Sequence, residues 1–287
     1  MSLFIYCFNW KVVNIRYFHR NRTIKAATEI VEYKIRNGGI YMKDMAIQTT
    51  TSINHLFENS STTKEQSTFK TLVIKYVKDP GSAITHFIGM VMAIGASIPL
   101  LIKASRQIDP LYLISMSVYA LSLILLYAAS TTYHTFDRSE RINTILKKID
   151  HMMISVLIAG SYTPICLLVL NKKTGIILLS IVWGIALIGI LIKAFWVYCP
   201  KWVSSILYIG MGWTCVLAFT QIFHALSPAG FGWLLIGGII YTVGGVIYAL
   251  KLPVFNNRHK YFGSHEIFHL FVMGGSLCHY IVMYAYI

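Results

Sequence analysis

The chain has 287 residues, of which 56% are hydrophobic and only 13% are charged. A soluble globular domain needs a larger charged surface than this, so that class is excluded. The formal net charge of +14 would suggest nucleic-acid binding in a soluble protein. Here the basic residues lie mostly in short loops beside apolar segments, where they set membrane topology and contact anionic lipid headgroups. We therefore expect membrane lipids, and no nucleic acid, as partners.

The cysteines give no sign of a special site. No pair has the C-x-x-C spacing of a metal site, and their scatter implies no disulfide framework. We interpret them as small buried side chains. They are Cys7, Cys166, Cys199, Cys215 and Cys278.

The N-terminal part differs from the rest of the chain. Residues 1–78 contain no apolar run of membrane-spanning length, and we expect them to form a cytoplasmic extension that is partly disordered, followed by a membrane domain over residues 79–287. Gly38-Gly39 can be encoded by a stretch that resembles a bacterial ribosome-binding site, and Met42 follows after two intervening codons. The hypothesis is that translation starts at Met42, so that residues 1–41 are not made.

The rest of the chain is organised in apolar blocks of the length that crosses a hydrocarbon core, roughly 20 residues each. Backbone polar groups cannot face lipid unsatisfied, so these blocks must be helices. The sequence therefore predicts an all-α bundle of seven transmembrane helices. The blocks are Ala83–Ile102, Leu111–Tyr133, His151–Leu170, Gly175–Phe195, Ser204–His224, Gly232–Leu250 and His265–Tyr286.

The distribution of Lys and Arg predicts the orientation of this bundle. The side of the N-terminal tail holds thirteen of these residues, counted from Lys64. The opposite side holds four, which are Lys103, Arg106, Lys172 and Lys173. We predict a cytoplasmic N-terminus and a C-terminus outside.

Three histidines come together at one membrane level in this topology. His134 ends the second span, and His265 and His269 open the seventh, all near the predicted cytoplasmic face. Ionisable groups within a membrane are costly and usually mark function. The i, i+4 spacing of His265 and His269 puts both imidazoles on one helix face, where they can share a metal. Three imidazoles and one water form the open tetrahedral site of catalytic zinc. The alternative is a set of interfacial histidines bonded to backbone carbonyls.

Two further residues have predicted roles in catalysis. Asp150 abuts the start of the third block, at the same membrane level, and is a natural partner for a water on the metal. Ser130 precedes His134 by four residues and shares its helix face, so its hydroxyl can support the ligand sphere.

Residues His265 to His269 also spell HExxH, the helical signature of zinc metalloproteases, with Glu266 as general base. No third ligand of the protease type follows downstream, so an intramembrane protease is a weaker alternative. His86 can pair either with the metal site or with a backbone carbonyl. His279 lies about 21 Å deeper than His265, too far to bind the same ion.

These residues lie in ordered motifs that resemble the hemolysin III family, the bacterial branch of the progestin and adipoQ receptor superfamily. The resemblance implies that His134, His265 and His269 are zinc ligands. It matches the family's aspartate to Asp150 and its serine to Ser130. The motifs are Asp79-Pro80-Gly81-Ser82-Ala83-Ile84-Thr85-His86, Ser130-Thr131-Thr132-Tyr133-His134, Asp150-His151 with Ala159-Gly160-Ser161-Tyr162-Thr163-Pro164, and His265-Glu266-Ile267-Phe268-His269 with Gly275-Ser276-Leu277-Cys278-His279.

The resemblance also implies a location and a function. It predicts a multi-pass protein of the bacterial plasma membrane and, through the related ceramidase-like proteins, a zinc-dependent hydrolase of a lipid amide or ester. A pore-forming cytolysin, which the family name suggests, and a receptor-like regulator of membrane lipid composition are the alternatives. One departure is Ser82, where many members carry Asn.

Overall fold

The computed structural model describes residues 77–250 and 263–287. The chain divides into two units, Met1–Thr71 and Leu72–Ile287, and the described residues all belong to the second. The expected extension over residues 1–78 therefore lies almost wholly outside the described residues, as does the proposed start at Met42.

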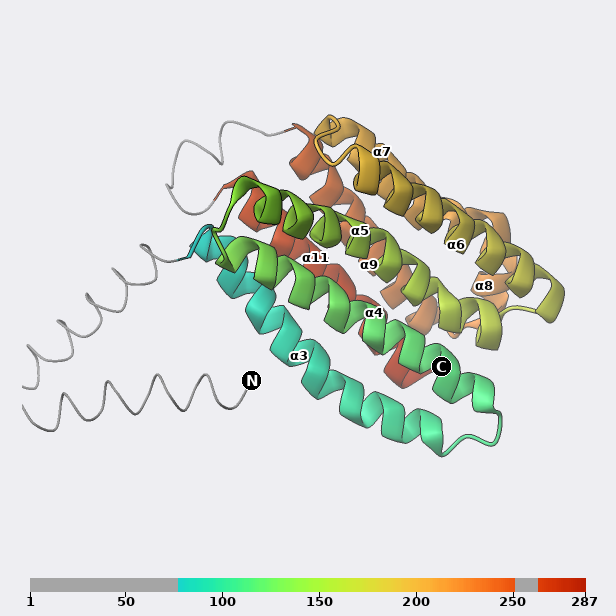
Figure 1. The fold of residues 1–287 in the computed structure, drawn as a ribbon. Coiled ribbons are helices and arrows are strands. Elements are labelled where there is room, and N and C mark those ends of the chain that lie inside the picture. The colour runs from blue at the N-terminus through green and yellow to red at the C-terminus, as the bar shows by residue number, and fades with distance from the viewer. Residues whose placement is uncertain (1–76, 251–262) are drawn as a thin grey trace, which may run out of the picture. The chain divides into compact units, whose positions relative to one another are not determined.

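Seven helical segments within these residues are long and apolar enough to cross a membrane, which confirms the predicted all-α membrane bundle (Figure 1). No strand occurs in the described part of the chain. The segments are α3 (Pro80–Ser105), α4 (Pro110–Thr135), α5 (Glu140–Pro164) with η2 (Ile165–Val169), α6 (Lys172–Phe195), α7 (Lys201–Gly212) with η3 (Trp213–Ala218) and α8 (Phe219–Ala225), α9 (Pro228–Leu250), and α11 (Ser264–Ile281) with η4 (Val282–Tyr286).

Helices that follow one another along the chain pack side by side, and the ring closes where α11 contacts both α9 and α3. α7 contacts both α5 and α9, so these helices and α11 surround the interior of the bundle. In Figure 1, α11 lies behind α4 and α5, with its first turn at the same end of the bundle as the start of α3. This ring brings the end of α4 and the start of α11 to one end.

Local sequence signals set several helix starts. Pro110 occupies the first turn of α4, and the Asp109 carboxylate accepts a hydrogen bond from the Leu111 amide at 2.9 Å. The Asn171 side chain caps α6 by accepting from Thr174 N at 3.0 Å. Both positions fall in the connections that the sequence predicts.

The start of α5 differs from the prediction. The apolar block begins at His151, but the helix begins at Glu140, after an N-cap at Ser139. Charged residues before His151 extend the helix beyond its apolar part because a capped helix can continue into the polar boundary of a membrane. Asp150 consequently lies in the third turn of α5, where it is buried.

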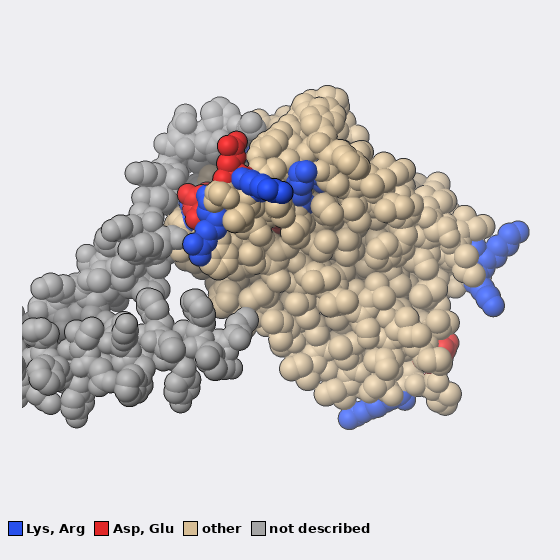
Figure 2. Space-filling model, in the orientation of Figure 1, with Lys and Arg blue, Asp and Glu red and all other residues tan. Residues whose placement is uncertain are grey.

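The surface of the bundle is apolar along its length. Large hydrophobic side chains such as Ile98 and Leu217 are 60–70% exposed, which a water-soluble protein would avoid at this scale. On the face shown in Figure 2, the charged side chains of the described residues lie at the two ends of the bundle, and an uncharged band separates them. This band is the surface expected to face lipid.

The glycines of α6 offer a test of helix packing. A Cβ at Gly175 would lie 2.0 Å from the backbone carbonyl oxygen of Cys166, whereas a Cβ at Gly184 on the same helix would have no neighbour within 4 Å. We expect Gly175→Ala to lower stability by about 1–3 kcal/mol, and Gly184→Ala to leave it unchanged or raise it by up to about 1 kcal/mol. Thermal melting of the two purified variants measures the difference. Equal melting temperatures would contradict the predicted close approach of α6 to η2.

Candidate metal centre

The three predicted ligands meet at one end of the bundle. His134 comes from the last turn of α4, and His265 and His269 come from the first turns of α11. One ring nitrogen of each lies within 4.8 Å of the others, and Nε2 of His134 is 3.2 Å from Nε2 of His265. His134 and His269 are 2% exposed, and His265 is partly buried. The structure thus brings together imidazoles that lie 131 residues apart in the chain.

The hydrogen bonds around these rings suit metal binding. Nδ1 of His134 is 2.9 Å from Oδ2 of Asp79, which leaves Nε2 directed at His265. A histidine that ligates zinc through one ring nitrogen usually donates a hydrogen bond from its other ring nitrogen to a carboxylate or a similar acceptor. The 3.2 Å separation of the two Nε2 atoms is compatible with two ligands each about 2.0–2.1 Å from one zinc ion. The residues present therefore fit a zinc ion, and ligand chemistry favours zinc over harder cations.

Asp79 is the functional residue that sequence reasoning missed. It directly precedes Pro80, and its backbone N–H donates to the His134 carbonyl oxygen at 2.9 Å. The hydrogen bond from His134 holds the pKa of the Asp79 carboxyl below its usual value, so the group stays ionised at neutral pH. The Asp-Pro pair gives a local signal for a helix start, but nothing in the sequence connects it to a ring 55 residues away.

α3 also contacts α11, the helix that carries His265 and His269. The His86 ring stacks on His269 with centroids 3.6 Å apart, and neither His86 ring nitrogen makes a hydrogen bond. Thr85 Oγ1 lies 3.4 Å from Nδ1 of His269. Of the two expectations for His86, the structure supports contact with the cluster over a bond to a backbone carbonyl.

Asp150 and Ser130 lie on the wall of a cavity that His265 and His269 also line. Asp150 is 6% exposed, and its carboxyl faces the Ser130 hydroxyl and the His134 ring. The Ser130 hydroxyl makes no hydrogen bond of standard geometry. Both predicted residues are thus close to the histidines, and their roles in catalysis remain predictions.

Glu266 faces away from the histidine cluster. Its carboxylate accepts a hydrogen bond from the Ser82 hydroxyl at 2.7 Å and another from the Gly263 backbone N–H at 2.8 Å. The second bond caps the N-terminus of α11. Because both carboxylate oxygens have structural partners, the arrangement does not favour the protease alternative, in which Glu266 is the general base.

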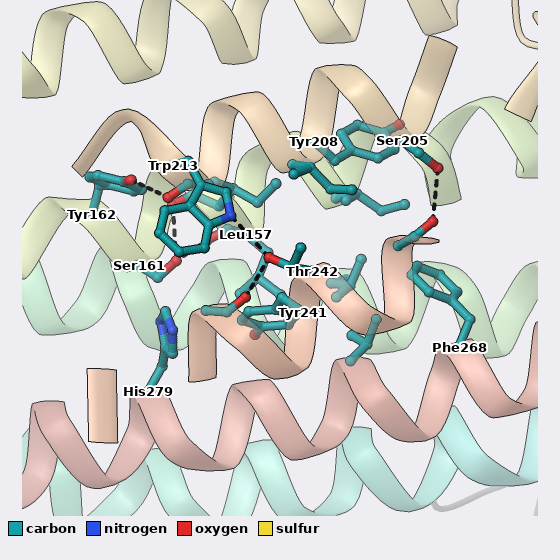
Figure 3. Close-up of a pocket in the computed structure, with 18 of the residues that line it drawn as sticks. Leu157, Ser161, Tyr162, Ser205, Tyr208, Trp213, Tyr241, Thr242, Phe268 and His279 are labelled. Atoms are coloured by element: carbon teal, nitrogen blue, oxygen red, sulfur yellow. Dashed lines mark hydrogen bonds between the residues drawn. The ribbon is translucent and has the colours of Figure 1, made fainter. Parts of the chain in front are cut away.

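The cavity extends from the histidines into the bundle between α5, α7, α9 and α11, with a volume of about 180 Å³. Aromatic and aliphatic side chains such as Phe268, Leu157 and Trp213 form most of its wall (Figure 3). His279 lines the end far from the cluster, and neither of its ring nitrogens has a hydrogen-bond partner. His279 lies in the last turn of α11, which on an ideal helix is about 21 Å from His265.

The contact between Asp79 and His134 predicts a measurable effect on metal binding. We expect Asp79→Asn to weaken zinc binding by about 10–100-fold, because His134 loses the carboxylate that fixes its ring. Asp137→Asn is the matched control, since Asp137 is exposed and bonds only Asn143 among the described residues. Competition with a chelator of known affinity gives both constants. Equal affinities in the two variants would contradict a supporting role for Asp79.

Comparisons with known proteins agree with this architecture. Residues 74–280 match the family model described as Haemolysin-III related. The chain is 37% identical to Hemolysin-3 of Bacillus cereus over 220 residues, which cover 76% of this chain and 95% of that protein. It is 38% identical to the Hemolysin-3 homolog of Bacillus subtilis (strain 168) over 205 residues, covering 71% and 92%.

A more distant similarity reaches animal proteins. The chain is 24% identical to the Adiponectin receptor protein of Drosophila melanogaster over 221 residues, which cover 70% of this chain but 49% of that receptor. The family-model match covers well over half of this chain, and the Bacillus relatives match it over nearly their full length. The chain therefore belongs to the haemolysin-III related family and is a multi-pass bacterial membrane protein related to adiponectin receptors.

Proposed function

We propose that the protein is a zinc-dependent hydrolase that cleaves a lipid amide or ester. The observation that carries this proposal is the convergence of three imidazoles, a buried carboxyl and an unpartnered hydroxyl at one end of an apolar cavity. Buried polar groups normally have partners, and groups without them mark candidate sites for ligands. A cavity lined by apolar residues with a few converging polar groups is typical of a small-molecule site.

His134, His265 and His269 would hold the ion, and Asp79 would keep the His134 ring in position. Zinc bound there would polarise a carbonyl group and lower the pKa of a water molecule towards ~7. The remaining chemistry falls to the chain's own side chains, which have to bind the substrate and move protons.

We assign proton transfer to Asp150. Its carboxylate would take a proton from the attacking water and return it to the leaving amine or alcohol as the bond breaks. The Ser130 hydroxyl, which faces Asp150, would donate a hydrogen bond either to that carboxylate or to the carbonyl oxygen of the substrate. Burial of Asp150 inside the bundle limits competition from bulk water.

The lining of the cavity supports the proposal that the substrate is a lipid. Its apolar wall suits a hydrocarbon chain, which would extend from the histidine cluster towards His279. An apolar wall is unsuited to conducting ions, because conducting pores need polar or charged linings. This feature favours the hydrolase over a pore-forming cytolysin, which the name Hemolysin-3 of the Bacillus relatives suggests.

The proton-transfer role distinguishes Asp150 from Glu266. We expect Asp150→Asn to lower turnover of ceramide or phospholipid by about 10²–10⁴-fold, while bound zinc stays near one ion per chain because the three imidazoles are intact. Glu266→Gln should retain most activity, since the oxygen of the glutamine amide can still accept the capping hydrogen bond from the Gly263 backbone N–H. His134→Ala should lose both zinc and turnover. Product formation in detergent or vesicles and elemental analysis measure both quantities.

Two outcomes would overturn the proposal. Wild-type protein with full zinc occupancy that hydrolyses neither ceramide nor phospholipid would contradict the hydrolase. Full rescue of a deletion strain's lipid profile by a His134→Ala copy would instead favour a regulator without catalysis. A larger loss of activity in Glu266→Gln than in Asp150→Asn would reverse the assignment of the general base.

A further inference from the structure

A second cluster of reactive side chains lies outside the histidine site, where α6 ends and α7 begins. Nζ of Lys193 donates hydrogen bonds to Sγ of Cys199 at 3.0 Å and to Oγ of Ser204 at 2.5 Å. Cys199 Sγ is also 3.4 Å from Ser204 Oγ. All three side chains are buried, with exposures of 1%, 7% and 4%. We call these residues the lysine–cysteine cluster.

The turn between the helices creates this arrangement. α6 ends at Phe195, and the Cys199 amide donates to the Trp196 carbonyl oxygen at 3.3 Å, which folds the chain back towards the last turn of α6. Pro200 then precedes the first residue of α7. Lys193 lies in the last turn of α6, a favourable position for a cation near the helix C-terminus.

The charge of Lys193 needs an anion nearby. Burying an ammonium group in an apolar interior is costly unless an opposite charge accompanies it. Across the two described segments, no Asp or Glu lies within ion-pair distance of Lys193. The Cys199 thiol is the acidic group in contact with it, so a thiolate–ammonium pair is the arrangement that balances the charge.

Three further titratable groups lie near Cys199. Lys147 of α5 adds a second positive charge, and Tyr208 of α7 and Tyr248 of α9 are the phenols near the thiol. Burial opposes ionisation of Cys199, but the hydrogen bonds from Lys193 and Ser204 outweigh it and bring the thiol pKa below its usual value.

We propose that Cys199 is a site of reversible oxidation by hydrogen peroxide, in which Lys193 first stabilises the thiolate and then forms a covalent bond to the oxidised sulfur. A thiolate is the form of cysteine that attacks peroxides, and sensor cysteines are thiolates held by neighbouring cations. The low exposure of Cys199 admits a small uncharged oxidant more readily than a bulky electrophile.

The reaction balances with the groups in the cluster. The thiolate sulfur attacks one peroxide oxygen and the O–O bond breaks, giving a sulfenic acid, while the departing hydroxide takes a proton from the Lys193 ammonium and leaves as water. The amine, now neutral, attacks the sulfur, the S–O bond breaks, and a second water leaves with a proton from nitrogen. The product is a sulfenamide, Cys199 Sγ–Nζ Lys193. Two equivalents of a thiol restore the amine and the cysteine and form one disulfide.

The test uses the full chain purified under reducing conditions and exposed to increasing hydrogen peroxide, then denatured with or without a dimedone-type trap for sulfenic acids, so that the trap reaches the buried sulfur. Peptide mass spectrometry follows Cys199 and, as an internal control, Cys278, which is buried and has no lysine partner among the described hydrogen bonds. We expect Cys199 to react at roughly tenfold lower peroxide than Cys278. We also expect a linked peptide that lacks two hydrogen atoms and separates on treatment with dithiothreitol.

Variants of Lys193 separate its two roles. Lys193→Arg keeps the positive charge but offers a poor nucleophile, so trapped sulfenic acid should accumulate without the linked peptide. Lys193→Met removes the charge and should slow oxidation of Cys199 by roughly tenfold. Ser205→Ala is the matched control, because Ser205 bonds the Gly245 carbonyl oxygen and not the cluster; it should behave as wild type.

Two results would overturn the proposal. Cys199 that reacts no faster than Cys278 in the wild-type chain would exclude a stabilised thiolate, whatever the behaviour of the variants. A linked peptide that forms equally in Lys193→Arg would exclude Lys193 as the nucleophile. If Lys193→Met does not fold, the wild-type comparison and the arginine variant still decide. Cys199 should show the same oxidation pattern in a His134→Ala chain. A negative result for Cys199 oxidation therefore leaves the proposed hydrolase activity untouched.

Discussion

The candidate metal centre depends on the first two turns of α3, which contact both ligand-bearing helices. Asp79 bonds His134 of α4 through its backbone amide and through its carboxylate. Asp79 is the N-cap of α3, and within the helix Ser82 bonds Glu266 of α11 and His86 stacks on His269. Neither α4 nor α11 alone determines where the other's histidines lie. α3, which supplies no ligand, therefore sets the separation of the ligands together with the direct hydrogen bond from Tyr127 of α4 to Ser276 of α11.

This arrangement also accounts for the unusual number of polar groups in a membrane interior. A buried imidazole or hydroxyl without a partner costs about 1–3 kcal/mol, and such groups persist when they serve function. Some members of the cluster satisfy one another, as His134 and Asp79 do. Others, including His86 and Ser130, have no hydrogen-bond partner. Most of the residues that carry an unpartnered buried atom line the cavity, which is the pattern expected where a bound group completes the site; they are His86, Ser130, His151, His265 and His279, whereas Tyr119, Thr131 and Ser155 lie elsewhere.

The sequence predicted the features that follow from local spacing and from membrane depth, including the meeting of His134 with His265 and His269, and missed the individual side-chain contacts made by tertiary packing. Apolar block length predicted the seven spans, and the i, i+4 spacing of His265 and His269 predicted a shared face. The role of Asp79 could not be predicted because its partner lies in another helix. The start of α5 at Glu140, ten residues before Asp150, was missed for a related reason, since hydropathy marks the apolar core of a span and not the end of its helix. The sequence indicates only a small buried side chain at Cys199, because the turn after α6 is what brings it to Lys193.

Each of the two clusters contributes some of its residues to the wall of one cavity. Asp150 and His269 line it from α5 and α11, whereas Ser204, which bonds Lys193, lines it from α7. The histidine cluster is held by α3, and among the described residues no hydrogen bond joins α3 to the lysine–cysteine cluster. A covalent bond between Cys199 and Lys193 would remove the positive charge on Nζ and draw this atom towards Sγ, which would weaken its hydrogen bond to Ser204 and alter the α7 side of the cavity. It would leave the contacts of α3 with His134 and His269 in place. Oxidation would therefore act on substrate fit before it acts on metal binding.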